Sequence, residues 1–186
     1  MPSLFLSFMA AVLAGFGGRD YRLVAHLSAR FDGSAMVLVL GLVSSLITAA
    51  VAAFGGSAIA SIAGGNAGLM LAALALLWAG LEMTWPWRRA LPQEPTRSAF
   101  AILAVLLATQ IGDAARFLIL AVAVATGSAL LSAMGGAIGG CAAIALAWSE
   151  PGRALPPALV RRMRMMLGVV LVLSGAVLAM VARGIV

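Results

Sequence analysis

The chain has 186 residues, of which 63% are hydrophobic and only 10% are charged, and its mean hydropathy is +1.12. Soluble globular domains carry about 25% charged residues, so this composition excludes an ordinary soluble fold and predicts one all-α integral membrane domain over residues 1–186. The net charge is +6, and every basic residue is Arg. These arginines lie mainly in short loops between apolar runs and form no continuous groove, so we expect a lipid bilayer around the chain and no nucleic-acid partner.

Six apolar runs, separated by polar or helix-breaking stretches, predict six transmembrane helices. They cover Ser3–Ala29, Ala35–Ala53, Ala67–Thr84, Ser98–Thr126, Ala129–Trp148 and Met165–Ala182. The first run has no basic segment before it and stays apolar past any plausible cleavage point. We therefore expect it to be a membrane helix rather than a cleaved signal peptide.

The distribution of arginine predicts the orientation of these six spans. The first, third and fifth loops carry eight arginines, whereas the opposite side carries only Arg183. Loops rich in arginine stay in the cytoplasm, so we expect both termini outside, in a plasma membrane such as the bacterial inner membrane. The eight are Arg30, Arg88, Arg89, Arg97, Arg153, Arg161, Arg162 and Arg164.

The two halves of the chain resemble each other at a constant offset of 95 residues. This offset pairs Gly17 with Gly112, Leu23 with Leu118, Gly41 with Gly136, Ala50 with Ala145, Ala52 with Ala147, and Gly80 with Gly175. Because each half has an odd number of spans, the halves must have opposite orientations, as in the inverted repeats of many secondary transporters. We expect repeat one over 1–84, an inter-repeat loop over 85–97 and repeat two over 98–186. We also expect Gly17 and Gly112 to face each other near the midplane, where glycine lets helices approach closely.

Charged residues interrupt the first span of each half, in "GFGGRDYRL" (15–23) and "QIGDAARFL" (110–118). A charge at bilayer depth is costly, so such residues usually face a protein interior or a polar path. Arg19, Arg22 and His26 share one helix face, with Asp20 beside it. One alternative is that Arg22 extends to the interface and that Arg19 and Asp20 form a structural pair. With Asp113 and Arg116, these groups carry one net positive charge, which would repel a bare dication and suit an anionic or zwitterionic ligand.

These two stretches resemble the repeated motif Glu-x-Gly-Asp-Lys/Arg-Ser/Thr of the Gdt-type six-helix calcium/manganese:proton antiporter family. In the first copy Gly17 and Arg19 fit the motif, Gly15 and Gly18 replace its acids, and Asp20 takes the hydroxyl position. "SARF" after it is similar to the usual continuation. In the second copy Gly112 and Asp113 fit, Gln110 replaces Glu, and Ala114 and Ala115 replace the last two residues.

The resemblance implies a six-helix inverted repeat that exchanges Mn²⁺ or Ca²⁺ for protons, with Asp113 as the remaining motif acid. Asp113 and Gln110 are three residues apart and therefore share a helix face, where their oxygens could bind a cation and, through Asp113, a proton. Thr109, Ser44, Ser45 and Thr48 could add hydroxyl ligands. The alternative is that Asp113 is a structural partner of Arg116 or Arg19.

Three functions stay open at this point. The first is a secondary transporter of divalent cations against protons, with a reduced site. The second is a transporter of altered specificity, for an anion or a small solute, and the third is a non-transporting partner subunit. The chain could act as a homodimer or pair with an intact homologue. No pattern typical of an enzyme or of a cofactor site occurs, and the single Cys141 is expected to be a packing residue.

Overall fold

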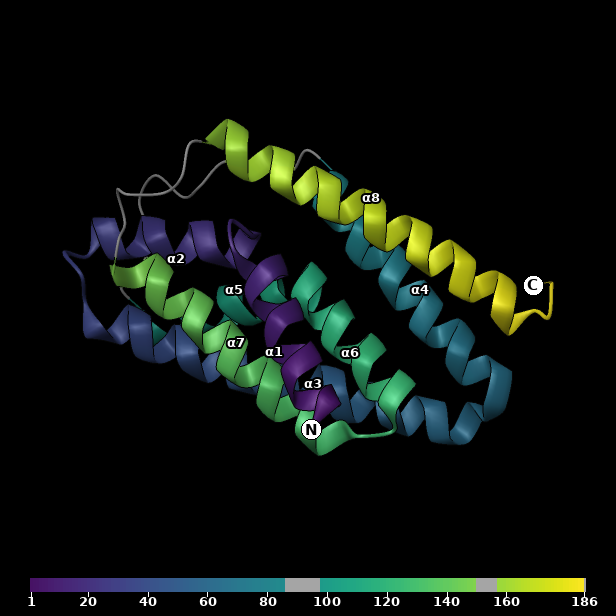
Figure 1. Cartoon of the computed structure of the whole chain (residues 1–186). Helices are drawn as coiled ribbons and strands as arrows, with labels where there is room; N and C mark the ends of the chain where they lie inside the picture. Colours follow the sequence, from purple (N-terminus) through teal and green to yellow (C-terminus); the bar gives the residue numbers. More distant parts are fainter. Residues whose placement is uncertain (86–97, 150–156, 186) are drawn as a thin grey trace.

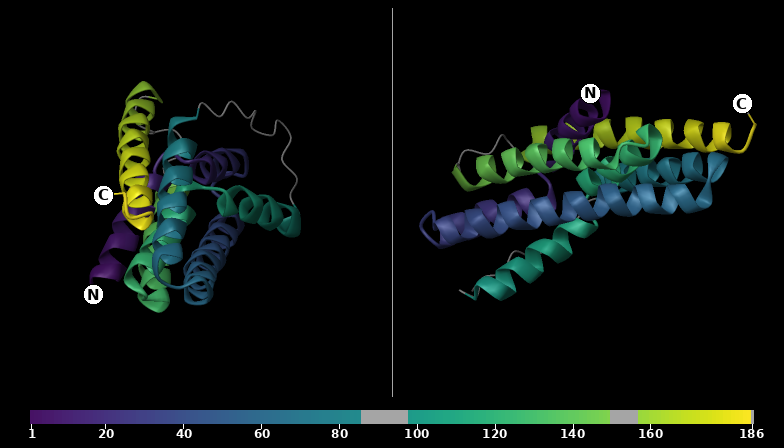
Figure 2. Two further views of the ribbon diagram at one scale, coloured as in Figure 1. Left: turned by 90° about the vertical axis from the view of Figure 1, so that its right-hand side faces the viewer. Right: turned by 90° about the horizontal axis from the view of Figure 1, so that it is seen from below.

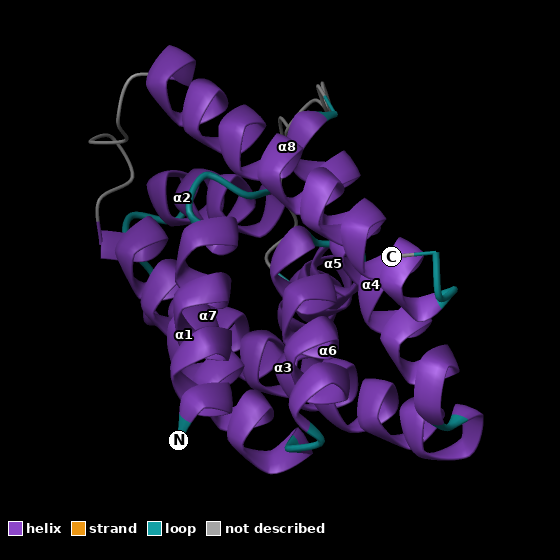
Figure 3. Cartoon of the chain, turned by 45° about the vertical axis from the view of Figure 1, so that its right-hand side comes forward, coloured by secondary structure: helices purple, strands orange, loops and turns teal. Residues whose placement is uncertain are grey.

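The computed structural model describes residues 1–85, 98–149 and 157–185, and in these residues it contains helices and no strand (Figure 3). The inter-repeat loop and its arginines lie outside the described residues, as does Arg153. The helices are α1 (Pro2–Gly15), α2 (Arg19–Arg30), α3 (Ala35–Ala63), α4 (Gly65–Thr84), α5 (Ala99–Ile111), α6 (Ala114–Thr126), α7 (Ala129–Ser149) and α8 (Pro157–Ala182).

In the described part of the chain, four helices are long and apolar enough to cross a membrane, or six if each of two bent helix pairs counts as one span. The bent pairs are α1 with α2, at 60°, and α5 with α6, at 57°. The sequence predicted continuous spans over 3–29 and 98–126, whereas each is broken near its middle. Gly17, in the turn between α1 and α2, has φ of +67°, which glycine adopts at little cost.

Two other boundaries differ from those expected. Helix α3 continues to Ala63, ten residues beyond the predicted end, because its glycines do not stop a helix whose neighbours pack against it. A Cβ on Gly56, for example, would lie 2.7 Å from Cγ of Leu120 on α6. Helix α8 begins at Pro157, since proline is well tolerated in a first helical turn, so Arg161, Arg162 and Arg164 lie on a helix rather than in a loop.

The helices pack as a bundle in which α7 lies between α1 and α3, and α4 runs along α8 at one side (Figures 1 and 2). Small residues let the helices approach closely. A Cβ on Gly135 would lie 2.1 Å from the carbonyl oxygen of Leu4, and one on Gly80 would lie 2.6 Å from that of Gly168. The α1–α7 and α4–α8 contacts therefore depend on glycine at these positions.

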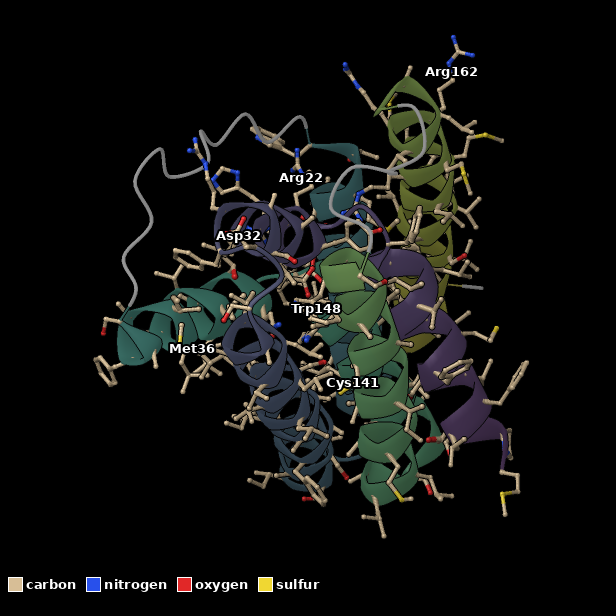
Figure 4. All side chains as sticks on the ribbon, turned by 90° about the vertical axis from the view of Figure 1, so that its left-hand side faces the viewer. Arg22, Asp32, Met36, Cys141, Trp148 and Arg162 are labelled. Atoms are coloured by element: carbon tan, nitrogen blue, oxygen red, sulfur yellow. The ribbon has the colours of Figure 1, made fainter. Side chains whose placement is uncertain are left out.

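Helix α2 differs from the others because one face is polar. Its buried residues include Tyr21, Val24 and Leu27, and Arg22 and Arg30 are exposed. Ser28 donates a hydrogen bond to the carbonyl of Trp148 on α7 at 2.8 Å, and the Trp148 indole donates to the carbonyl of Ser34 at 3.1 Å. Trp148 lies among the helices, whereas Arg162 projects from the end of α8 (Figure 4). The first bond holds the end of α2 against α7, and the second joins α7 to the start of α3, while Arg19 at the start of α2 donates to the carbonyl of Gly112 at the break in α5–α6.

Candidate functional site

A buried group of polar side chains lies where the two helix breaks meet the middle of α3; we call it the Arg116 cluster (Ser45, Thr48, Asp20, Asp113 and Arg116). Arg116, only 4% exposed, is its centre. Its Nη1 lies 3.5 Å from Oδ2 of Asp20 and 3.8 Å from Oδ2 of Asp113. Its Nε donates to the Thr48 hydroxyl at 2.9 Å, and its Nη2 donates to that of Ser45 at 3.2 Å. Two carboxylates and two hydroxyls thus surround one guanidinium.

The cluster depends on the helix breaks for its geometry. Asp113 directly precedes α6, and Asp20 is the second residue of α2, so each break directs one carboxylate at Arg116. The main-chain N–H of Tyr21 donates to Oδ1 of Asp20 at 2.8 Å and fixes that side chain. A Cβ on Gly140 of α7 would lie 2.3 Å from the Ser45 Oγ, so glycine at this position leaves space for the hydroxyl that binds Arg116.

Asp113 is fully buried and has the fewest bonds in the cluster. Among the described residues, neither of its carboxylate oxygens has a hydrogen-bond partner, and the nearest ion-pair partner is the Arg116 Nη1 at 3.8 Å. A charge-assisted hydrogen bond is about 2.7–2.9 Å long, so this contact is an ion pair without a bond. The alternative was that Asp113 is a structural partner of Arg116 or Arg19. Arg116 does lie beside Asp113, but without a hydrogen bond to it. Arg19, the other candidate partner, binds elsewhere.

Gln110, also fully buried, lies three residues before Asp113, at the end of α5. Its Oε1 accepts from the Thr48 hydroxyl at 3.0 Å, and its Nε2 has no hydrogen-bond partner in the part of the chain that the structure describes. Thr48 has only one proton, and the carbonyl of Ser44 lies closer to its oxygen, at 2.8 Å. If the Ser44 carbonyl accepts the hydrogen bond from the Thr48 hydroxyl, the Gln110 side-chain amide must be flipped. Its Nε2 then donates to the Thr48 oxygen, and its Oε1 is left without a partner. One end of the amide is unbonded in either orientation.

A second group, the Glu82 cluster (Glu82, Arg19 and Arg164), lies beside the first. Glu82 Oε1 is 3.2 Å from Nε of Arg19, and Glu82 Oε2 accepts from Nη2 of Arg164 at 2.8 Å. In the sequence, Glu82 lies near the end of the third predicted span, and Arg164 was expected in a loop. Both side chains are instead largely buried, because each charge has an opposite charge within reach. The signal that could have identified Glu82 is an acid within an apolar span.

Other candidate residues lie outside these clusters. The Thr109 hydroxyl donates to carbonyls of its own helix, those of Val105 and Leu106, as threonine in helices commonly does. Arg22 is exposed, and its exposure fits the expected extension to the interface. His26 is half-buried on α2, about two turns after Arg19.

Gly17 and Gly112 do not have the neighbours that were expected. A Cβ on Gly17 would meet Cγ1 of Val160 on α8 at 2.3 Å, and one on Gly112 would meet only the Arg19 guanidinium, at 3.4 Å. The two glycines therefore pack against α8 and against Arg19 rather than against each other. The bend at each break, which the helical periodicity does not reveal, carries the two backbones apart.

The charges of the two clusters balance, with three guanidinium groups and three carboxylates among the described residues. The sequence predicted one net positive charge because Glu82 was not counted. The described residues contain no group of three or more His, Cys, Asp or Glu side chains that could hold a metal ion. A cation at this point would therefore need oxygen ligands other than three carboxylates, such as the Gln110 amide and neighbouring hydroxyls beside Asp113.

Comparison of the chain with protein-family models, with curated proteins and with solved structures gave no match. The geometry of the two clusters provides a buried carboxylate and a buried amide with unbonded atoms, next to a guanidinium that has other partners. If such a carboxylate takes a proton or a cation, its own pair with Arg116 weakens, while Arg116 keeps Asp20 and two hydroxyl partners.

Proposed function

We propose that the chain is a secondary transporter that exchanges a divalent metal cation, Mn²⁺ or Ca²⁺, for protons across a plasma membrane. Its six spans form two inverted repeats, α1–α4 and α5–α8, with both termini outside. In support of the repeat, the two breaks fall at positions related by the 95-residue offset, and their bends are 60° and 57°. Transporter sites typically lie at such broken helices near the midplane.

The observation that carries this proposal is the carboxylate of Asp113, fully buried and without a hydrogen bond. A buried polar group without a partner is costly, and native proteins keep such groups chiefly where a ligand, water or proton completes them. Gln110 faces the same break and also has an unbonded end. A cation that loses part of its hydration shell could take oxygen ligands from both side chains, and the backbone carbonyls of the break could add to them.

The arrangement around Arg116 explains how Asp113 could change its ligand. Arg116 keeps Asp20 at 3.5 Å and two hydroxyls when Asp113 turns to a cation or takes a proton. The guanidinium is therefore not stranded in either state. Exchange follows because Asp113 can neutralise only one partner at a time, so the arrival of the cation releases the proton.

A second candidate, transport of a small zwitterionic or anionic solute, is favoured by one specific observation. Three guanidinium groups lie within the two clusters, and arginine binds carboxylate and phosphate groups with two parallel bonds. For such a solute, Arg116 and Asp113 would bind its opposite ends. A partner subunit that does not transport is the third candidate, and absence of flux would favour it.

Flux measurements on the purified chain in proteoliposomes test the proposal. Lumenal pH is followed with a trapped dye while Mn²⁺ or Ca²⁺ is added outside. We expect proton movement that depends on the cation, absent in Asp113→Asn and retained in Asp32→Asn, a control change in an exposed turn. Cation-independent uptake of a labelled amino acid would favour the second candidate. No flux of either kind in the wild-type protein would contradict transport.

A further inference from the structure

Arg164 binds the end of α1 at the first helix break. Its Nη1 donates to the carbonyl of Ala14 at 2.6 Å and to that of Phe16 at 3.4 Å. The last carbonyls of a helix have no partner within the helix, and at bilayer depth no water replaces it. Arg164 comes from α8, 148 residues after Phe16, so the second half of the chain completes the first break.

Arg19 has the corresponding role at the second break. Its Nη2 donates to the carbonyl of Gly112, the residue that ends α5. Arg19 is the first residue of α2, so the first half of the chain completes the second break. Each break is thus capped by an arginine from the opposite half.

Glu82 joins these two arginines. One carboxylate oxygen lies 3.2 Å from Nε of Arg19, and the other accepts from Nη2 of Arg164 at 2.8 Å. Each guanidinium has a second nitrogen that remains on its carbonyl. We propose that Glu82 is a positioning residue that, through Arg19 and Arg164, holds the two helix breaks in one arrangement.

This linkage explains why an acid in the apolar α4 is only 7% exposed. A single carboxylate contacts two guanidinium groups, and each guanidinium binds a helix end at a break, which Asp20 or Asp113 of the Arg116 cluster follows in the chain. Movement at one break therefore changes the position of the arginine at the other. Glu82 touches neither Asp113 nor Arg116 in the contacts described above, so it acts through Arg19 and Arg164.

Hydrogen exchange measured by mass spectrometry on the full chain in nanodiscs tests the linkage. We expect Glu82→Gln to raise amide exchange at both 15–18 and 111–113 by about tenfold, because it weakens a charge-assisted hydrogen bond to Arg164 and an ion pair with Arg19. In Arg164→Lys the single ammonium group can stay on Glu82 but cannot also bind the α1 carbonyls. The end of α1 then loses its partner while Glu82 and Arg19 keep their positions, so exchange should rise at 15–18 only. Asp32→Asn, a matched acid-to-amide change in an exposed turn, should change neither segment.

A rise at only one break in Glu82→Gln, or equal rises at both breaks in Arg164→Lys, would overturn the linkage. If Glu82→Gln does not fold, Glu82→Asp keeps the charge but is one methylene shorter, and it should raise exchange at one break or both; unchanged exchange at both would overturn the linkage. A second measurement, of cation flux, rests on the proposed function. In flux assays Glu82→Gln should lower the maximal rate of transport about tenfold with an unchanged KM for Mn²⁺. Absence of flux in the wild-type protein would refute transport and leave the exchange result decisive for the linkage.

Discussion

Asp113→Asn should cost little folding free energy, because Arg116 keeps most of its contacts in the variant. The contact that weakens is the longest in the cluster, 3.8 Å from Nη1 to Oδ2. Asp20 at 3.5 Å, Thr48 at 2.9 Å and Ser45 at 3.2 Å remain. Removing one partner of a buried pair costs about 3–5 kcal/mol when the other charge is left uncompensated. Since this charge stays compensated, we expect a loss of only about 1–2 kcal/mol, close to one hydrogen bond.

The loss of stability in Arg116→Gln is the reference for the loss in Asp113→Asn. Arg116→Gln leaves Asp20 with a main-chain bond from Tyr21 and leaves Asp113 with no counter-ion in the cluster. Two buried carboxylates lose their charge partner, so we expect a loss of about 3–5 kcal/mol. The ratio between the variants therefore measures how far Asp113 is needed as a structural counter-ion.

Reversible unfolding in a single mixed-micelle system, titrated with a denaturing detergent, measures both variants against the wild type. Asp32→Asn, in an exposed turn, is the control for loss of an acid. An Asp113→Asn loss as large as that of Arg116→Gln would refute the reasoning. It would show that Asp113 is committed to Arg116 and is not available to a substrate.

Two further results are expected from the packing and the charge distribution. Gly140→Ala should destabilise the protein by about 1–2 kcal/mol in the same assay, because its Cβ would displace the Ser45 hydroxyl from Arg116, whereas Gly55→Ala, with open space around it, should be neutral or stabilising. Single cysteines placed at Ser34 and Thr126 in a chain without Cys141 should react with an impermeant maleimide from opposite sides of the membrane, Thr126→Cys from outside. Labelling of both from one side would contradict the orientation.

The apolar runs predict the helix positions well because membrane helices follow hydropathy more than local periodicity. The two breaks were not predicted as breaks, since each lies inside a run long enough to cross a bilayer. Their location was nevertheless indicated by the charges of Arg19 and Asp113, which a continuous apolar helix does not explain. The charged residues next to glycine thus marked the positions of the two breaks, but a continuous helix was predicted where the chain bends.

Glu82 and Arg164 show the limit of sequence reasoning for this site. Each taken alone lies near the end of an apolar run, and a charged residue there commonly reaches the headgroups. They form a pair only because α4 and α8 run side by side, 82 residues apart at this contact. The contact depends on the tertiary packing of glycines such as Gly80, and no pattern within either helix specifies it.

The first of the two stretches that resemble the antiporter motif departs from it at positions 15, 18 and 20, and the structure couples positions 18 and 20. A Cβ on Gly18 would lie 3.0 Å from Oδ1 of Asp20 and 2.9 Å from the carbonyl oxygen of Gly15. An acid at position 18 and the acid at position 20 therefore compete for the same space and would repel each other there. The chain that places a carboxylate at position 20 consequently needs a small residue at position 18.

This coupling makes a prediction about restoring the motif. Gly18→Asp alone should destabilise the protein by about 1–3 kcal/mol, through overpacking and like-charge repulsion beside Asp20. Gly18→Asp combined with Asp20→Ser gives the Gly-Asp-Arg-Ser sequence of the motif. The second change removes the charge repulsion and the close contact with the side chain of residue 20, whereas the close contact with the Gly15 carbonyl remains. The double variant should therefore regain most of the lost stability, because a carboxylate at position 18 can replace Asp20 beside Arg116. A double variant no more stable than Gly18→Asp would show that the two positions are independent.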